Sequence, residues 1–136
     1  MINNYKKDLI KYRIDRAKEA IEEVKILIEA KKFNAAITRI YYGIFFIINA
    51  LCLIDNFSTS KHSQLIGYFN KEYVKRKLVD PKIGKFLNRA YELRTKSDYG
   101  ELVNFIKEEV ENYFKEMKLF ITTIEKIIDK KISGHR

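Results

Sequence analysis

The sequence predicts an all-α fold, an up-and-down bundle of about five helices in one domain over residues 1–136. That length is enough for one ordinary domain and too short for two. Only one Pro and five Gly interrupt the chain, which favours long helices. Apolar residues make up 46% of the chain and recur at three- and four-residue steps, and no stretch alternates with the period of a strand.

The first helix is expected over residues 4–31. Apolar side chains recur there at helical spacing, and Lys, Arg and Glu fill the positions between them. That pattern is typical of an amphipathic helix on the outside of a bundle. Phe33 and Asn34 interrupt it, and the Asn34 side chain is predicted to cap the next helix by accepting a hydrogen bond from an early backbone N–H.

The second helix, over residues 35–54, is predicted to be the buried centre of the bundle. Its most apolar part, residues 40–54, contains Asn49 and is 15 residues long. A membrane span needs roughly 20 predominantly apolar residues, and extending this run toward its start brings in Arg39. A short helix that is apolar all round is more typical of a protein core, so no membrane association is expected.

A polar loop and a proline set the next two boundaries. Five of the seven residues in 55–61 are Asp, Asn, Ser or Thr, and Ser60 is predicted to cap a short helix over about 61–75. Asp80 and Pro81 then predict the start of a fourth helix. Asp caps well, and Pro loses nothing at the first helical position because its missing N–H would be unpaired there.

The fourth helix is expected to run to about Tyr99 and to stop at Gly100. A last, long helix is expected over about 102–131, where apolar side chains form a continuous stripe at three- and four-residue spacing. Residues 132–136 are expected to form a frayed tail. Short connections between five helices favour antiparallel packing of sequential neighbours.

The positive charge is concentrated in one part of the chain. Lys and Arg number 27 against 18 Asp and Glu, a net charge of +9, and residues 61–97 carry 10 basic and 3 acidic side chains, a net +7. Such an excess fits either an anion-facing surface or the solvated helix faces of a Lys-rich chain. The N-terminal residues show no signal peptide and the chain has one Cys, so a cytoplasmic location is expected.

Several kinds of catalytic or metal site lack their sequence signatures. Neither His62 nor His135 follows a Glu by three positions, as a four-helix di-metal site requires. One Cys and two His do not build a structural zinc site, and the chain has no Gly-rich phosphate loop. Cys52 lies in the apolar second helix, where a thiol acts as a small hydrophobe. We therefore expect no metal and no cofactor.

What remains is a set of polar residues in an apolar context. Arg39 and Tyr42 are three residues apart and share one face of a helix, and Tyr91, Arg94 and Asp98 share another face by the same spacing rule. A buried unpaired charge is costly. These groups are therefore expected either to pair with one another, as Arg94 and Asp98 can, or to line a wet cleft.

Four segments, in order along the chain, carry a family resemblance. They are residues 35–52 (AAITRIYYGIFFIINALC), 61–63 (KHS), 69–75 (FNKEYVK) and 89–99 (RAYELRTKSDY). Together they resemble the HEPN domain family, and in particular one largely uncharacterised branch of it, over about residues 10–131. The resemblance implies a helical bundle that forms a homodimer, commonly as a small toxin encoded beside a minimal nucleotidyltransferase antitoxin.

The resemblance also implies a chemistry, which this sequence matches only in part. Many HEPN proteins are metal-independent ribonucleases in which an Arg stabilises charge on the phosphate and a His, four to six residues later, acts as general acid and base. Arg94 matches that Arg, but the TKSDYG that follows it holds no His, and Tyr99 stands where a His could be. Tyr is a poor general base at pH 7. His62 is the remaining candidate, and only the tertiary fold could bring it near Arg94.

Two functional hypotheses from different classes follow. In the first, a non-catalytic homodimer is one member of a toxin–antitoxin-like pair, and it binds a nucleotidyltransferase partner, a nucleotide or RNA. In the second, the chain is a ribonuclease toxin, with Arg94 of two subunits flanking a basic cleft and His62 nearby. The residues expected to contact nucleotide or RNA are Arg39, Tyr42, Tyr91, Asp98 and Tyr99.

Overall fold

A computed structural model describes residues 3–98 and 104–134 of the chain, and every regular element in these ranges is helical. The predicted all-α class is therefore confirmed. Tyr99 and Gly100, where the fourth helix was expected to stop, lie outside the described residues. The elements are α1 (Asn4–Glu29), α2 (Phe33–Ile54), α3 (His62–Phe69), a short π-helical segment η1 (Asn70–Val74), α4 (Pro81–Asp98) and α5 (Lys107–Ser133).

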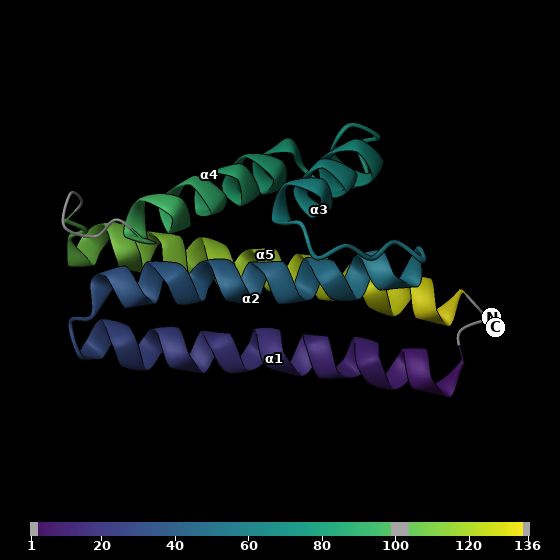
Figure 1. The fold of residues 1–136 in the computed structure, drawn as a ribbon, viewed down its shortest axis with the longest axis horizontal. Helices are drawn as coiled ribbons and strands as arrows, with labels where there is room; N and C mark the ends of the chain where they lie inside the picture. Colours follow the sequence, from purple (N-terminus) through teal and green to yellow (C-terminus); the bar gives the residue numbers. More distant parts are fainter. Residues whose placement is uncertain (1–2, 99–103, 135–136) are drawn as a thin grey trace.

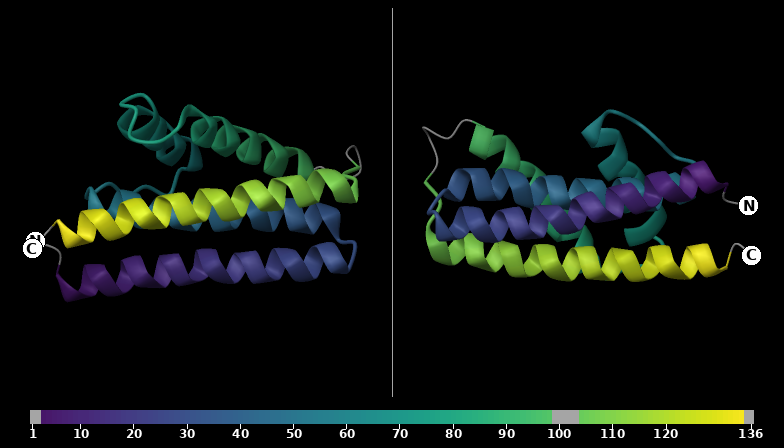
Figure 2. Two further views of the ribbon diagram at one scale, coloured as in Figure 1. Left: turned by 180° about the vertical axis from the view of Figure 1, so that it is seen from behind. Right: turned by 90° about the horizontal axis from the view of Figure 1, so that it is seen from below.

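Three long helices form the body of the molecule, and the shorter ones cover one side of it. Helices α1, α2 and α5 lie side by side, with α1 antiparallel to the other two (Figure 1). Helix α4 returns across them toward the start of α2, and α3 lies beyond the start of α4. The views from behind and below show the same arrangement, with the first turn of α1 and the last turn of α5 at one end of the bundle (Figure 2).

Helix α2 is the centre of this bundle, as its composition predicts. It packs against α1, α3, α4 and α5. It is also the one helix among residues 3–98 and 104–134 that is long and apolar enough to cross a membrane by length and composition, and most of its apolar window is buried by the other helices. Its buried residues are Ala36, Ile37, Ile40, Tyr41, Gly43, Ile44, Ile47, Ile48, Ala50, Leu51, Cys52 and Ile54.

Gly43 lies where three helices approach one another closely. A Cβ atom at this position would lie 3.1 Å from Cβ of Ala20 on α1 and would collide with Cε of Met117 on α5. Close approach of this kind keeps a core dense, and it leaves room only for hydrogen at Gly43.

A polar cluster at the C-terminal end of α2 holds the α3–η1 segment in place. The Asp55 carboxylate accepts hydrogen bonds from the hydroxyls of Tyr73 (2.5 Å) and Tyr68 (3.2 Å), and from Nζ of Lys131 on α5 (3.0 Å). Burial and the neighbouring Asp55 raise the pKa of Tyr68 to about 12, so its hydroxyl keeps the proton that it donates. This cluster joins the end of α2, the α3–η1 segment and α5.

Two predicted helix caps are wrong, and each has a local cause. Helix α2 begins at Phe33 behind Lys32, so Asn34 lies inside the helix. The chain leaves α1 through Lys31, whose φ is 61°, and the N–H of Lys32 still bonds to the α1 carbonyl of Leu27, so the connection is shorter than the sequence suggests.

The second wrong cap is Ser60. Lys61 occupies the N-cap position of α3, and the Thr59 hydroxyl accepts the hydrogen bond from its N–H at 3.1 Å. The Asp80–Pro81 boundary is confirmed, because α4 begins at Pro81 and Oδ1 of Asp80 accepts a hydrogen bond from the N–H of Lys82 at 2.9 Å. Local capping chemistry therefore decides this start.

The last helix is displaced along the chain from its predicted range. Helix α5 begins at Lys107 rather than near residue 102. Ile106 before it is extended, and its backbone N–H donates a hydrogen bond to Oε1 of Glu109 at 3.2 Å. It continues to Ser133, so residues 132 and 133 are helical rather than part of a frayed tail. Ile132 is partly buried against the core, which supports these last turns.

Candidate functional site

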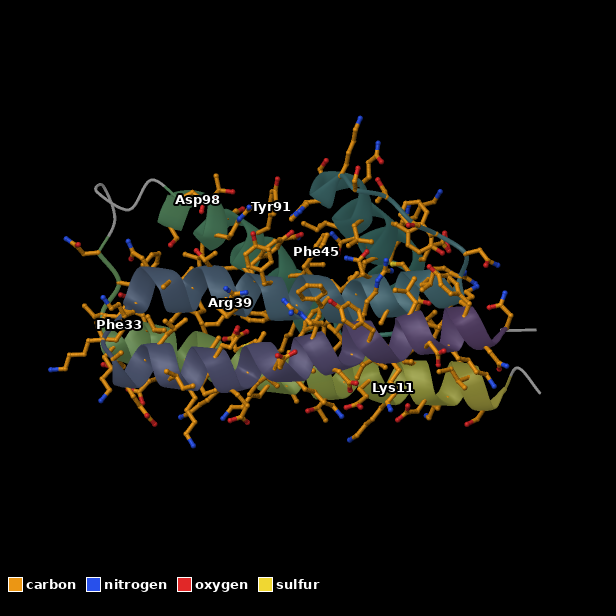
Figure 3. All side chains as sticks on the ribbon, turned by 60° about the horizontal axis from the view of Figure 1, so that its bottom comes forward. Lys11, Phe33, Arg39, Phe45, Tyr91 and Asp98 are labelled. Carbon is orange, nitrogen blue, oxygen red and sulfur yellow. The ribbon has the colours of Figure 1, made fainter. Side chains whose placement is uncertain are left out.

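One side of α2 is not covered by the long helices and carries aromatic and basic side chains. Tyr42, Phe45 and Phe46 are half-buried there, and Arg39 lies one turn before Tyr42. The three- and four-residue spacing places these residues on one face. Figure 3 shows Arg39 and Phe45 on this side of α2, with Tyr91 of α4 above them.

Helix α4 is fixed over the start of α2 by a buried hydroxyl. The Ser97 hydroxyl donates to the backbone carbonyl of Asn34 at 2.8 Å and accepts from the Thr38 hydroxyl at 3.3 Å. Ser97 is the one buried polar residue within the described ranges. Because Arg94 lies about one turn earlier on α4, this anchor places it above the aromatic residues of α2.

Arg94 lies against aromatic rings and beside the carboxylate of Asp98. Its guanidinium carbon is 5.6 Å from the ring centre of Tyr41 and 6.0 Å from that of Tyr42, within the range of cation–π attraction. Nε lies 3.4 Å from Oδ2 of Asp98 without hydrogen-bond geometry, and among the described residues this buried atom has no hydrogen-bond partner. The predicted Arg94–Asp98 pair is therefore present but leaves Nε unsatisfied.

The fold brings His62, the first residue of α3, to the same place. Its Nδ1 lies 2.7 Å from the hydroxyl of Tyr41, and its ring stacks on Phe45 with centres 4.1 Å apart. Burial, and after it the positive charge of Arg94, lowers the pKa of His62 below its ordinary value. The neutral form of His62 is therefore favoured, and His62 and Arg94 both lie beside Tyr41.

Tyr41 joins the histidine and the arginine. Its side chain is fully buried, and burial raises its pKa well above the ordinary value, so the hydroxyl keeps its proton. When that hydroxyl donates to Nδ1 of His62, the neutral imidazole carries its own proton on Nε2; in the other tautomer Nδ1 donates to the hydroxyl oxygen and Nε2 is the free acceptor. The Tyr91 ring lies 5.7 Å from that of Tyr41 and completes the aromatic surroundings.

Two further arginines extend the same surface. The guanidinium of Arg39 lies 5.3 Å from the ring centre of Tyr42, and its Nε lies 3.8 Å from Oε1 of Glu23. The guanidinium of Arg16, on α1, lies 5.2 Å from the ring centre of Phe46. We call this surface the arginine–aromatic face; its residues are Arg16, Arg39, Tyr41, Tyr42, Phe45, Phe46, His62, Tyr91, Arg94 and Asp98.

The structure thus gathers most of the residues singled out from the sequence. Arg94, His62, Tyr91 and Tyr42 lie around Tyr41. Asp98 lies beside Arg94, and Arg39 lies beside Tyr42. Tyr99 lies outside the described residues.

Sequence reasoning missed three residues of this face, and gave a fourth, Tyr41, no role. Phe45 and Phe46 follow Tyr42 by three and four positions, a spacing that could have revealed them. Arg16 gave no such signal, because it belongs to the charged pattern of α1. Among the described residues no three His, Cys, Asp or Glu side chains lie close enough together to hold a metal ion.

Comparison with known proteins agrees with the resemblance. The chain matches the family model of the HEPN domain over residues 10–127. It is 40% identical over 126 residues to a UPF0332 protein of Thermotoga maritima, covering 93% of this chain and 96% of that protein. It is 30% identical over 127 residues to a Methanocaldococcus jannaschii protein named "Putative toxin MJ0142", covering 93% of this chain and 86% of that one.

A second Methanocaldococcus jannaschii protein, named "Putative toxin MJ0605", is 30% identical over 128 residues, covering 94% of this chain and 95% of that one. The matched range of the family model includes the helices that carry Tyr41, His62 and Arg94. With a family match over most of its length and relatives aligned almost end to end, the chain belongs to the HEPN domain family.

Proposed function

We propose that this chain is the toxin-like member of a two-protein pair and that its arginine–aromatic face binds RNA or a nucleotide. The observation that carries the proposal is the position of Arg94, whose guanidinium lies 5.6 and 6.0 Å from the ring centres of Tyr41 and Tyr42 and whose buried Nε has no hydrogen-bond partner among the described residues. The names of the two archaeal relatives support the toxin-like role.

The side chains of this face are suited to bind the phosphate and the base of a nucleotide. An arginine fork binds phosphate oxygens through two parallel hydrogen bonds, and half-buried aromatic rings stack on unpaired bases. Arg94 supplies the fork, and Tyr42 and Phe45 supply ring surface. The net charge of +9 raises the local concentration of a polyanion around the protein.

We further propose that the chain acts as a homodimer with a minimal nucleotidyltransferase as its antitoxin partner, in the cytoplasm. The family resemblance and the toxin names of relatives support this setting. A two-fold axis near Phe46 would cover that half-buried ring and bring two Arg94 side chains to one cleft.

A second candidate function, metal-independent RNA cleavage, is favoured by one observation: His62 and Arg94 both lie beside Tyr41. When Nδ1 of His62 carries the proton and donates it to the Tyr41 hydroxyl oxygen, Nε2 is the free acceptor and can take the proton of a ribose 2′-hydroxyl as that oxygen attacks the adjacent phosphorus. The bond from phosphorus to the 5′-oxygen then breaks, leaving a 2′,3′-cyclic phosphate, and the leaving oxygen takes the proton that His62 holds after the attack, relayed through water. Arg94 would stabilise the charge that develops on the phosphoryl oxygens.

The binding proposal is tested with a fluorescent single-stranded RNA of mixed sequence and two matched variants of α4. Arg94→Ala should weaken binding about tenfold or more, because a charge-assisted hydrogen bond is worth about 1.5–3 kcal/mol. Arg89→Ala removes the same charge from an exposed position outside the face and should weaken binding less than about threefold. Equal loss in both variants would show that only overall charge matters.

The cleavage proposal is tested with His62→Gln, which keeps a polar group of similar size. Gel analysis should show that this variant retains RNA binding but loses cleavage by about 100-fold or more, the usual contribution of a general base. Cleavage by His62→Gln at the wild-type rate would contradict a role for His62. Absence of cleavage by the wild-type protein would leave the chain as a binding module.

A further inference from the structure

A second surface feature lies on the opposite flank of α4. It is a groove between α4 and α5 with a volume of about 290 Å³. Basic side chains outnumber acidic ones in its lining, and apolar side chains complete it. The lining residues are Lys82, Ile83, Lys85, Phe86, Arg89, Glu116 and Leu119. We call this the α4–α5 groove.

The basic residues of the groove form a row along α4. Lys82, Lys85 and Arg89 are three and four positions apart, so they share one flank over about two helical turns. All three are exposed, and none takes part in an ion pair within residues 3–98 and 104–134. Part of the +7 of residues 61–97 is therefore presented to solvent at this groove.

The floor of the groove is apolar. Phe86 and Ile83 are 6% and 8% exposed and belong to the core, whereas Leu119 of α5 is 63% exposed beside them. A large apolar side chain this exposed, rimmed by charge, is a feature of surfaces that bind a partner. The groove therefore offers apolar contact at its centre and positive charge along one side.

The groove is separate from the arginine–aromatic face. Arg94 follows Lys85 by nine positions, and at about 100° per residue the two side chains leave α4 on opposite sides. A molecule in the groove would therefore leave Arg94 accessible.

The lining favours protein over RNA as the occupant. Single-stranded RNA needs exposed ring faces for its bases, and the one aromatic residue of the groove, Phe86, is almost fully buried. A groove between two helices, with an apolar floor, is suited to an amphipathic helix.

We propose that the α4–α5 groove binds an acidic amphipathic helix of a partner protein. One or two large apolar side chains of that helix would contact Phe86 and Leu119, and its carboxylates would pair with Lys82, Lys85 and Arg89. Charge complementarity sets the choice of partner and speeds the encounter. The inference stands independently of what the arginine–aromatic face binds.

The test uses the full chain and a synthetic helical peptide of about 16 residues, long enough to hold a helix. The peptide carries a leucine and phenylalanine stripe flanked by glutamates, and fluorescence anisotropy measures its dissociation constant. Lys85→Glu/Arg89→Glu should weaken binding about tenfold or more. Lys25→Glu/Lys126→Glu makes the same change of net charge at exposed positions outside the groove and should weaken it less than about twofold.

Two further measurements separate apolar docking from simple charge attraction. Leu119→Ser should weaken peptide binding about fivefold or more, since it removes the exposed apolar contact. A peptide with lysines in place of the glutamates should not bind. Unchanged thermal unfolding of each variant shows that it is folded. Saturable binding that is equal in all variants, or no binding of the acidic peptide to the wild type, would overturn the proposal.

Other occupants give distinct results. If the groove takes RNA, Lys85→Glu/Arg89→Glu should lose RNA binding more strongly than Lys25→Glu/Lys126→Glu while peptide binding is absent. If it takes a second copy of this chain, the groove variant should lower the molar mass in solution. Either result would overturn the partner-helix proposal, and neither depends on Arg94.

Discussion

At the scale of single residues, the position of His62 is the feature with the clearest measurable consequence. Its pKa is lowered first by burial and then by the charge of Arg94, from an ordinary value of 6.5. We predict that Arg94→Ala raises the pKa of His62 and that Arg39→Ala leaves it unchanged, because Arg39 does not contribute to the shift. Titration of the imidazole signals by NMR measures both, and an unchanged value in Arg94→Ala would contradict the geometry.

The same pKa gives a pH dependence of stability. A histidine whose pKa is lower in the folded state binds fewer protons there than in the unfolded state. The stability due to neutral His62 is therefore complete above pH 6.5 and is lost as the pH falls through the folded-state pKa. We predict that His62→Gln reduces the loss of stability between neutral pH and pH 5, measured by urea unfolding. An identical pH profile in both proteins would refute it.

Arg94 and its neighbours on α4 could be chosen from sequence, whereas their link to His62 could not. Spacing along one helix is enough to put Tyr91, Arg94 and Asp98 on one face. The approach of His62 depends on where α3 packs, which no local pattern in residues 55–61 determines. For the same reason Tyr41 and Tyr42 look equivalent in the sequence, although one is buried beside His62 and the other is half-buried.

At the scale of helices, Gly43 sets how closely α1, α2 and α5 pack. Gly43→Ala adds a methyl group that must displace Met117 and press on Ala20. We predict a loss of about 1–3 kcal/mol in the free energy of unfolding, as for other overpacked cores. Gly67→Ala, on α3, is the matched control, since nothing lies within 4 Å of its Cβ. It should stabilise the protein by up to about 1 kcal/mol, because Ala favours helix.

Chemical denaturation of both glycine variants measures the difference between them. Equal stability would mean that the three helices adjust freely around position 43.

The helix boundaries differ in whether local sequence or tertiary packing sets them. Asp80 and Pro81 start α4 by their own chemistry, while the start of α2 depends on how tightly the chain turns after α1.

At the scale of the whole molecule, we predict a homodimer. Phe46 is half-buried on the arginine–aromatic face, and a second copy would cover its ring. Light scattering at micromolar concentration should give twice the 16.2 kDa mass of one chain. Phe46→Glu should shift the mass to that of the monomer, and Leu119→Glu, in the α4–α5 groove, should not. A monomeric wild-type protein would contradict the prediction.

The bundle as a whole was predictable because few breakers and a strong helical period leave little choice of class. Its apolar centre was predictable for a related reason: α2 carries almost no charge, so it must be surrounded by the others. The sequence could not show which flank of α4 adjoins the aromatic residues of α2. Both α4 flanks carry Arg or Lys, and only the packing of α4 between α2 and α5 shows that one flank adjoins aromatic rings and the other a groove.

The arrangement around α2 also affects folding during synthesis. Helix α5 supplies Met117, Phe120, Ile121, Ile124 and Ile128 to the core, yet it is the last of the described helices to be translated. Until it emerges from the ribosome, the face of α2 that it covers stays exposed to water. Since domains fold as units, the chain gains its compact form only after α5 has left the ribosome. A nascent chain that stalls before α5 would expose the apolar face of α2, which chaperones or proteases could recognise.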